Sequence, residues 1–408
     1  MSAADLPRRP EWDRIQRTAL AAGIVGLGLC VLGGIVGQLL TGESEGGLLR
    51  WLFDRAQFFR SYLVAYLFVL GIGLGSWVIL MVHHLTGGDW GWALRGVLQA
   101  GTRTIPLLVL LFLPLLLGLH DLYPWARWTE EQIQESKTFQ SKSLYLNQPF
   151  FLVRAFVYLA AWVVLSILLV RSSAGLPRTP AESEPRRLRM LSSPGLLAYG
   201  LTITFASIDW VMSIEPLWYS TIYGPLFATG QALSGMAFAI AALVWLAPPA
   251  EFSAVITRKH LRDLGNLMLA FIMLWAYMSF SQFLLIWSGN LPEEIVWYKR
   301  RLQGGWEFIG VLLILLHFVL PFLLLLSRDV KHNPRTLAAV AALLLGIHLV
   351  DLYWVVVPGF FPFQAFRLHW MDPAAVVGLG GIWLAFFLRE LRQPLLPQPV
   401  NTEEGHHG

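Results

Sequence analysis

Hydrophobic residues along the chain gather into ten long apolar segments, which shorter polar stretches separate. Each segment spans about 20 residues, the length that an α-helix needs to cross the hydrocarbon core of a bilayer. The segments are residues 18–40, 60–82, 95–119, 150–170, 194–214, 218–247, 263–288, 304–327, 335–357 and 373–390. This pattern predicts an all-α integral membrane protein of about ten transmembrane helices.

The polar stretches between these segments are too short to form a second globular domain. We therefore expect an N-terminal tail over residues 1–17, one membrane domain over 18–390 and a C-terminal tail over 391–408. Composition agrees with this division, because 14% of the residues are charged, whereas soluble proteins carry about 25%. The net charge of +4 is modest and indicates topology, not binding to nucleic acid.

The distribution of lysine and arginine predicts the orientation of the helices, because cytoplasmic loops are enriched in these residues. Of the 30 in the chain, 18 fall in the two tails and in the loops on their side of the predicted membrane, and 10 fall on the opposite side. Both termini are therefore predicted to be cytoplasmic. A full-length apolar span without a cleavage motif follows the N-terminus, which indicates a retained tail instead of a signal peptide.

Cys30 is the only cysteine, which argues against a disulfide framework, a thiolate zinc site or an iron–sulfur cluster on this chain. Haem b needs two histidines that face each other. Only His317 and His348 lie well inside predicted helices, and their spacing does not suit a haem. We expect no metal site and no covalently bound cofactor, so any redox centre that needs thiolates would lie on a partner chain.

Ionisable residues inside the apolar segments are the first candidates for chemistry, because charges are costly in a bilayer and therefore face the protein interior. His348 and Asp351 are three residues apart, so they share one helix face and can form a hydrogen bond. A carboxylate favours the protonated imidazole while burial disfavours it, so the pair could exchange protons near neutral pH. The alternative is a polar pair that only holds two helices together.

Most of the other ionisable groups lie toward the predicted outer face and are further candidates for a proton path. The set of proton-relay candidates is His348, Asp351, Asp209, Glu307, His317, His120 and Asp121. Arg103 and Arg154 are candidate counter-ions for buried carboxylates. Hydroxyl and amide groups on the segment 263–288 could hold a chain of water molecules, although such groups also serve helix packing. These are Asn266, Tyr277, Ser281 and Gln282.

Several long runs of sequence go beyond this general pattern. They are FRSYLVAYLF, MVHHLTGGDWG, LPLLLGLHDLYPWA, LNQPFFLVRA, SIDWVMSIEPLWYSTIYG, LRDLGNLMLAFIMLWAYMSFSQFLLIWSGNLPEEIVWY and HFVLPFLLLLSRDVKHNP. Together they resemble the ActF family of membrane subunits from bacterial alternative complex III, and the resemblance extends over about residues 55–390. That complex is a respiratory quinol:cytochrome c oxidoreductase of the bacterial cytoplasmic membrane.

The resemblance implies an NrfD-like fold with two four-helix bundles, at about residues 60–214 and 218–357, plus peripheral helices. It implies a position beside a homologous, quinol-oxidising sister subunit, with a multihaem cytochrome c, an iron–sulfur protein and small membrane subunits as further partners. Haem c and iron–sulfur clusters would lie on those partners. The implied role is proton conduction through half-channels, a quinone-facing surface, or both, within the respiratory electron transport chain.

Two other functions remain open. A stand-alone secondary transporter would suit ten helices, but the sequence shows no mid-span helix break opposite a symmetric partner, which transport folds use at their binding sites. A purely structural anchor of the complex would use its buried charges only to hold helices together. Catalysis by the isolated chain is not expected under any of these functions.

Overall fold

The computed structural model describes residues 10–39, 52–135, 137–173, 185–247 and 249–391. Every regular element in these ranges is a helix. Ten of the spans that these helices form are long and apolar enough to cross a membrane, and they overlap the ten predicted segments one by one. The prediction of an all-α, multi-pass membrane protein is therefore confirmed.

The spans include segmented as well as continuous helices. They are α1 (Pro10–Leu39), α3 (Arg55–Thr86), α4 with α5 (Asp89–Arg103 and Ile105–Leu117), α9 (Gln148–Ser173), α10 (Arg186–Trp210), α11 (Tyr223–Leu246), α13 (Arg258–Gly289), α15 with η4 and α16 (Trp306–Leu313, Ile314–Val319 and Leu320–Leu326), α18 (Pro334–Phe360) and α19 (Met371–Glu390). The helix α1 begins at Pro10, inside the stretch predicted as a tail.

Short helices connect these spans. They are α6 (Leu119–Leu122), η2 (Pro124–Arg127), α7 (Glu130–Glu135), α8 (Lys137–Ser143), η3 (Met212–Ile214), α12 (Pro249–Val255), α14 (Pro292–Arg301) and α17 (Arg328–His332).

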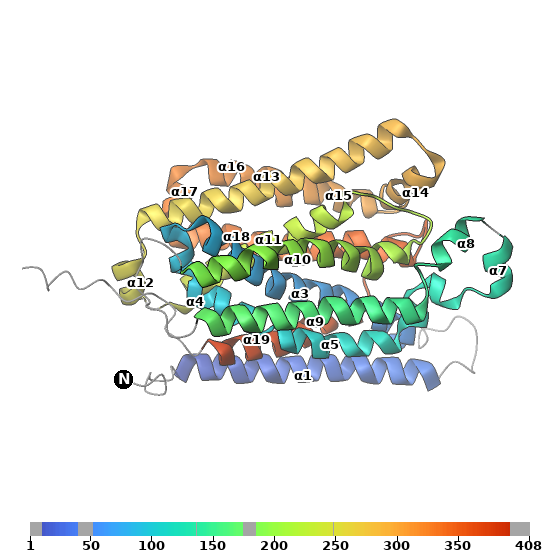
Figure 1. The fold of residues 1–408 in the computed structure, drawn as a ribbon, viewed down its shortest axis with the longest axis horizontal. Coiled ribbons are helices and arrows are strands. Elements are labelled where there is room, and N and C mark those ends of the chain that lie inside the picture. The colour runs from blue at the N-terminus through green and yellow to red at the C-terminus, as the bar shows by residue number, and fades with distance from the viewer. Residues whose placement is uncertain (1–9, 40–51, 136, 174–184, 248, 392–408) are drawn as a thin grey trace, which may run out of the picture.

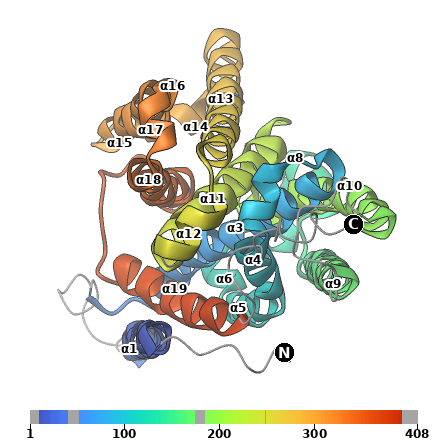
Figure 2. The ribbon, with the colours of Figure 1, turned by 90° about the vertical axis from the view of Figure 1, so that its left-hand side faces the viewer.

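Helices α1 and α19 lie side by side at one edge of the molecule (Figure 2) and run in opposite directions. Glycines allow the contact, because a Cβ on Gly23 would lie only 2.7 Å from the backbone nitrogen of Ile382. The start of α1 and the end of α19 therefore share one end of the molecule, which we call the terminal end. The opposite end, which we call the loop end, holds α7, α8 and α14 (Figure 1).

Helix α3 is the most deeply buried span, since 94% of its most apolar window lies inside the protein. It packs against α11 so closely that a Cβ on Gly75 would lie 1.9 Å from the carbonyl oxygen of Gln231. Gly235 meets the backbone of Gly75 in the same way. The centre of the fold is therefore a crossing of two backbones that only glycine permits at this distance.

Two spans are interrupted near their middle, although the sequence predicted no clear break. Helix α4 ends at Arg103 and α5 begins at Ile105, because Pro106 has no N–H to continue the helical bonding. In the eighth span, Pro321 cannot donate to the carbonyl of His317, and the preceding residues widen into the π-helical turn η4. His317 therefore lies in an irregular turn at mid-span.

Candidate functional site

A cavity with a volume of about 820 Å³ lies among α11, α13, α14, α15, η4 and α18. Small-molecule sites typically enclose roughly 300–1,000 Å³ and carry a few polar groups on apolar walls. The walls of this cavity follow that pattern, because most of them are aliphatic or aromatic. The polar side chains that line it are Tyr223, Gln231, Tyr277, Ser279, Gln282, Tyr298, Glu307, His348 and Asp351.

His348 and Asp351 lie on the cavity-facing side of α18, in the half of the span nearer the loop end. The distance from Nδ1 of His348 to Oδ2 of Asp351 is 3.7 Å, which is too long for a hydrogen bond. The hydrogen bond that their spacing predicted is therefore not formed. Trp275 on α13 lines the cavity together with this pair, and Nδ1 of His348 has no hydrogen-bond partner among the described residues.

His317 adjoins this pair from the π turn. Its side chain is fully buried, and its ring stacks on Trp275 with the two centroids 4.0 Å apart. The ring centroid of His348 lies 6.0 Å from that of His317. Neither ring nitrogen of His317 finds a hydrogen-bond partner in the part of the chain that the structure describes. Three helices thus bring two histidines and a carboxylate together around one tryptophan.

Glu307 lies at the start of α15 and lines the same cavity. Its carboxylate accepts a hydrogen bond from the backbone N–H of Gly305 at 2.8 Å. The structure therefore gathers four of the seven predicted relay residues at or beside one cavity. His348, Asp351 and Glu307 line it, and His317 lies behind Trp275.

A buried ion cluster lies at the loop end, behind Trp297 and Trp354, which line the cavity. Arg301, with a side chain that is 1% exposed, donates to Glu215 at 2.8 Å and to the backbone carbonyl of Trp354 at 3.2 Å. Its guanidinium stacks on Trp297, 3.6 Å from the ring centroid. Burial lowers the pKa of Arg301 below that of an ordinary arginine, and Glu215 offsets part of this effect. Arg300 also pairs with Glu215.

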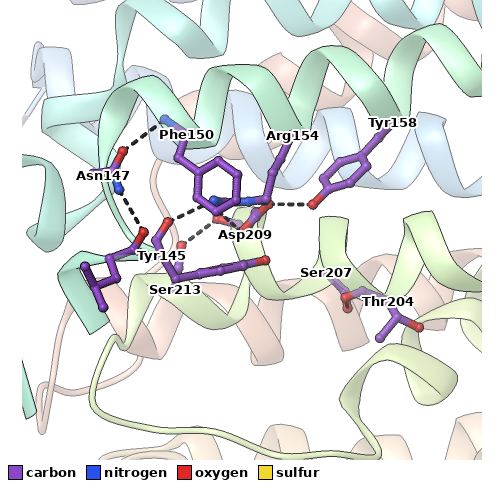
Figure 3. A network of polar contacts seen from close by, with 10 residues as sticks. Tyr145, Asn147, Phe150, Arg154, Tyr158, Thr204, Ser207, Asp209 and Ser213 are labelled. Carbon is purple, nitrogen blue, oxygen red and sulfur yellow. Dashed lines mark hydrogen bonds and ion pairs between the residues drawn. The ribbon is translucent and has the colours of Figure 1, made fainter. Parts of the chain in front are cut away.

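Asp209 belongs to a different cluster, between α9 and α10 (Figure 3). Arg154 donates to both carboxylate oxygens of Asp209 at 2.9 Å, and the hydroxyl of Tyr158 donates at 3.0 Å. The guanidinium also stacks on Tyr145 and Phe150, at 3.8 and 4.3 Å from their ring centroids. Arg154 is therefore the counter-ion of Asp209, and this carboxylate is separated from the cavity residues by its own set of partners.

The remaining ionisable candidates lie apart from the cavity. His120 is exposed and meets Gln148, while Asp121 pairs with Arg55 and Arg127 at the loop end. Arg103 donates to the backbone carbonyl of Glu390 at 3.3 Å, at the end of α19. This contact directs Arg103 from α4 toward α19 and away from the cavity.

Two of the four candidates for a water chain, Tyr277 and Gln282, line the cavity, whereas Asn266 and Ser281 do not. Asn266 accepts a hydrogen bond from Lys331 at 2.8 Å, about 16 Å along α13 from Tyr277. Tyr277 is 68% exposed and lies at the rim of the cavity. Gln282 is buried and bonds to Ser220 and Tyr298. A helix turns 100° per residue, so polar groups close in sequence can face different surroundings.

Gln231 was not among the residues predicted from the sequence, although it links two parts of the fold. It is 2% exposed, accepts a hydrogen bond from the hydroxyl of Tyr199 at 2.9 Å and lines the cavity. Its amide nitrogen has no hydrogen-bond partner among the described residues. A lone amide inside an Ala- and Gly-rich helix could have been noticed as a polar group at membrane depth.

Asp372 was also missed, because it lies just outside the apolar segment that begins at 373. It accepts hydrogen bonds from Ser61 at 2.6 Å and from Gln57 and Tyr353 at 3.0 Å. A further bond comes from the backbone N–H of His369 at 2.8 Å. The cluster fixes the start of α19 against α3 and α18 and lies outside the cavity lining.

Within the described residues, no group of three or more His, Cys, Asp or Glu side chains could hold a metal ion. A scan against protein-family models finds no match, and a search of curated proteins finds none either.

Proposed function

We propose that the chain is a membrane subunit of a respiratory quinol:cytochrome c oxidoreductase of the alternative complex III type, in which it conducts protons through half of the membrane. The observation that supports this role best is the group of His317, His348 and Asp351, buried together beside a cavity. Buried ionisable groups without fixed counter-ions are the usual elements of proton paths in membranes.

The geometry suits proton transfer in steps. His317 lies about 17 Å along its span from the loop end, and His348 lies about 18 Å from the end of α18. The two ring centroids are 6.0 Å apart, so the imidazoles are direct neighbours. Asp351 and then Glu307 continue the series along the cavity toward the loop end. A proton that crosses the full membrane potential exchanges about 2.3 kcal/mol per 100 mV.

The helix packing is compatible with the NrfD-like arrangement. Helices α3, α4 with α5, α9 and α10 pack around one another, as do α11, α13, α15 with α16, and α18. Helices α1 and α19 lie at the edge. We propose that these two groups are the predicted bundles, that both termini are cytoplasmic and that the membrane is the bacterial cytoplasmic membrane.

In this proposal the partner subunits carry the redox centres. A multihaem cytochrome c and an iron–sulfur protein would hold the haem c and the clusters, small membrane subunits would complete the assembly, and the sister subunit would oxidise quinol. Asp209 forms a bidentate ion pair with Arg154. This pair favours a structural role, in which it holds α9 and α10 together, over a role in the relay.

The first experiment is gentle purification of the chain from its native membrane, followed by mass spectrometry of the co-eluting proteins and a haem spectrum. The proposal expects a multihaem cytochrome c and an iron–sulfur protein. A solitary, haem-free chain would overturn it and favour the transporter.

The second experiment compares Asp351→Asn with Asp121→Asn in the assembled complex within vesicles. We expect Asp351→Asn to lower the number of protons released per electron, because Asp351 lies in the cavity. Asp121→Asn is the control, since this carboxylate pairs with two arginines at the loop end. Equal proton release in both variants and in the unaltered complex would contradict the relay.

A further inference from the structure

The cavity opens sideways, toward the region that lipid occupies. Its lining includes Tyr277 and Phe280 of α13 on one side and Val311 and Ile314 of the eighth span on the other. All four side chains are more than half exposed, and they lie within the membrane-crossing parts of their helices. Exposed apolar side chains at this depth face lipid. The cavity therefore opens on a face of the membrane-crossing helices that no described part of this chain covers.

The helix packing explains why this side is open. Helix α13 packs against α16, α17 and η4 toward the terminal end and against α14 at the loop end. Helix α15 instead packs against α18 and α14. The two helices diverge where they flank the cavity, and Figure 2 shows α13 projecting away from the α15–α17 group. We call this opening the lateral window, defined by Tyr277, Phe280, Val311 and Ile314.

Two polar side chains line the buried side of the cavity. The amide nitrogen of Gln231 and Nδ1 of His348 both lack a partner among the described residues, and both side chains line the cavity. They are 2% and 5% exposed. Gly230 lets α11 approach α18 here, because a Cβ on it would lie 2.8 Å from Cε1 of His348. The amide N–H of Gln231 is an unpaired buried donor, which costs stability, so a ligand with an acceptor atom would relieve that cost; Nδ1 of His348 can donate a second hydrogen bond in the tautomer that carries its proton there.

From these observations we infer that the cavity is a binding site, entered through the lateral window, for a membrane-soluble amphiphile with a neutral, carbonyl-bearing head and an apolar tail. The head would accept hydrogen bonds from Gln231 and His348, and the tail would leave between α13 and α15. The inference extends the proposed function but does not require proton conduction, because it depends on the cavity, its donors and its window.

The charges of the side chains that line the cavity limit which ligand head groups can bind. The described lining contains no lysine or arginine, while it includes the carboxyl groups of Glu307 and Asp351. A phosphate or a fatty-acid carboxylate would therefore meet no cation in a site of low dielectric constant, where an unpaired charge is strongly disfavoured. Two neutral sources remain, the head of an isoprenoid quinone and the ester groups of a diacylglycerol.

The test uses the intact complex and an azido-benzoquinone with a ten-carbon tail as the probe. After illumination, mass spectrometry maps the labelled peptides of this chain alone, so that a quinol site on a sister subunit does not contribute. We expect label on α11, α13, α15 or α18. Displacement by decylubiquinone would assign the quinone head, and displacement by dioleoylglycerol alone would assign the ester head. Label that neither compound displaces, or label confined to other helices, would overturn the inference.

Two variants make the assignment specific. Gln231→Leu removes a donor and should weaken the apparent affinity for the probe by roughly two- to tenfold, the effect of one hydrogen bond. Val311→Trp narrows the lateral window from the lipid side, where it disturbs little packing, and should also reduce labelling. Ile24→Trp is the control, because Ile24 is equally exposed on α1, away from the cavity. Equal labelling in Val311→Trp and Ile24→Trp would refute entry through the window.

The outcome separates this inference from the proposed function. Displaceable label in the cavity, together with normal proton release by Asp351→Asn, would support the binding site and contradict the relay. No displaceable label, together with reduced proton release by Asp351→Asn, would support the relay and contradict the binding site.

Discussion

Asp209 and Asp351 are both carboxylates inside long helices near the loop end, yet their surroundings differ. Asp209 is fully buried and accepts three side-chain hydrogen bonds, two of them from the guanidinium of Arg154. Asp351 pairs with no arginine among the described residues, and Nδ1 of His348 lies 3.7 Å from its Oδ2. Burial alone therefore does not show whether a carboxylate in a membrane is a structural or a functional group.

The difference follows from the chemistry of the partners. A guanidinium stays charged throughout the physiological range and fits a carboxylate in a bidentate geometry, so Arg154 holds Asp209 in one state and one position. An imidazole can gain or lose a proton near neutral pH. The group around Asp351 is thus the one that can change its charge, and it is also the one that lines a cavity.

Removing Arg154 should produce the largest change in stability. Arg154→Leu leaves Asp209 buried without its counter-ion, which in other proteins costs about 3–5 kcal/mol. We expect a loss of this order in the free energy of unfolding, measured by transfer from a mild detergent into a denaturing one. The double variant Arg154→Leu with Asp209→Leu should recover most of it, because no unpaired charge remains. An unstable double variant would mean that the stacking on Tyr145 and Phe150 carries the effect.

The ten spans could be predicted because membrane crossing imposes a length and a polarity that local sequence reports directly. The buried ionisable residues were also visible, since a charge inside an apolar run is conspicuous. The partner of each buried charge could not be predicted. Arg154 could have paired with several carboxylates, and only the packing of α9 against α10 places it beside Asp209. Pairing is a property of packing between segments, which one sequence does not record.

Two further features lay outside what the pattern can report. Arg301 occurs in a polar stretch between two apolar segments and was not among the predicted residues, but aromatic rings and Glu215 enclose it. Gln231 was not predicted either, and its burial depends on the approach of α3 at Gly75. In both cases the position of another helix determines whether the polar group is buried.

The crossing at Gly75 provides the second prediction, because it joins the two regions compared above. Gly75→Ala places a methyl group where the carbonyl oxygen of Gln231 lies 1.9 Å away, so α11 must move. Overpacking of this kind costs about 1–3 kcal/mol, and thermal unfolding in detergent would measure it. Gly28→Ala is the matched control, since a Cβ there meets no atom within 4 Å. Equal midpoints for the two variants would show that the helices separate without cost.

A smaller effect is expected from the hydrogen bond that joins α10 to α11 at Gln231, beside this crossing. Tyr199→Phe removes the hydroxyl that donates to Gln231 and leaves a buried amide oxygen unpaired, at a cost of about 1–2 kcal/mol. Tyr277→Phe serves as the control, because its side chain is 68% exposed. The free energy of unfolding should fall only for Tyr199→Phe. If it also fell for Tyr277→Phe, removal of a hydroxyl from any helix in this region would explain the loss.

The smallest change should come from His317, which is as deeply buried as Asp209. His317→Leu deletes two ring nitrogens that have no hydrogen-bond partner among the described residues, so no other polar group is left unsatisfied. Replacing such a group by an apolar side chain is close to neutral, and we expect the free energy of unfolding to change by less than about 1 kcal/mol. A loss as large as that of Arg154→Leu would show that His317, like Asp209, holds helices together. A stable protein would instead mean that stability does not account for a histidine at this depth, and its reason must lie in what the site does.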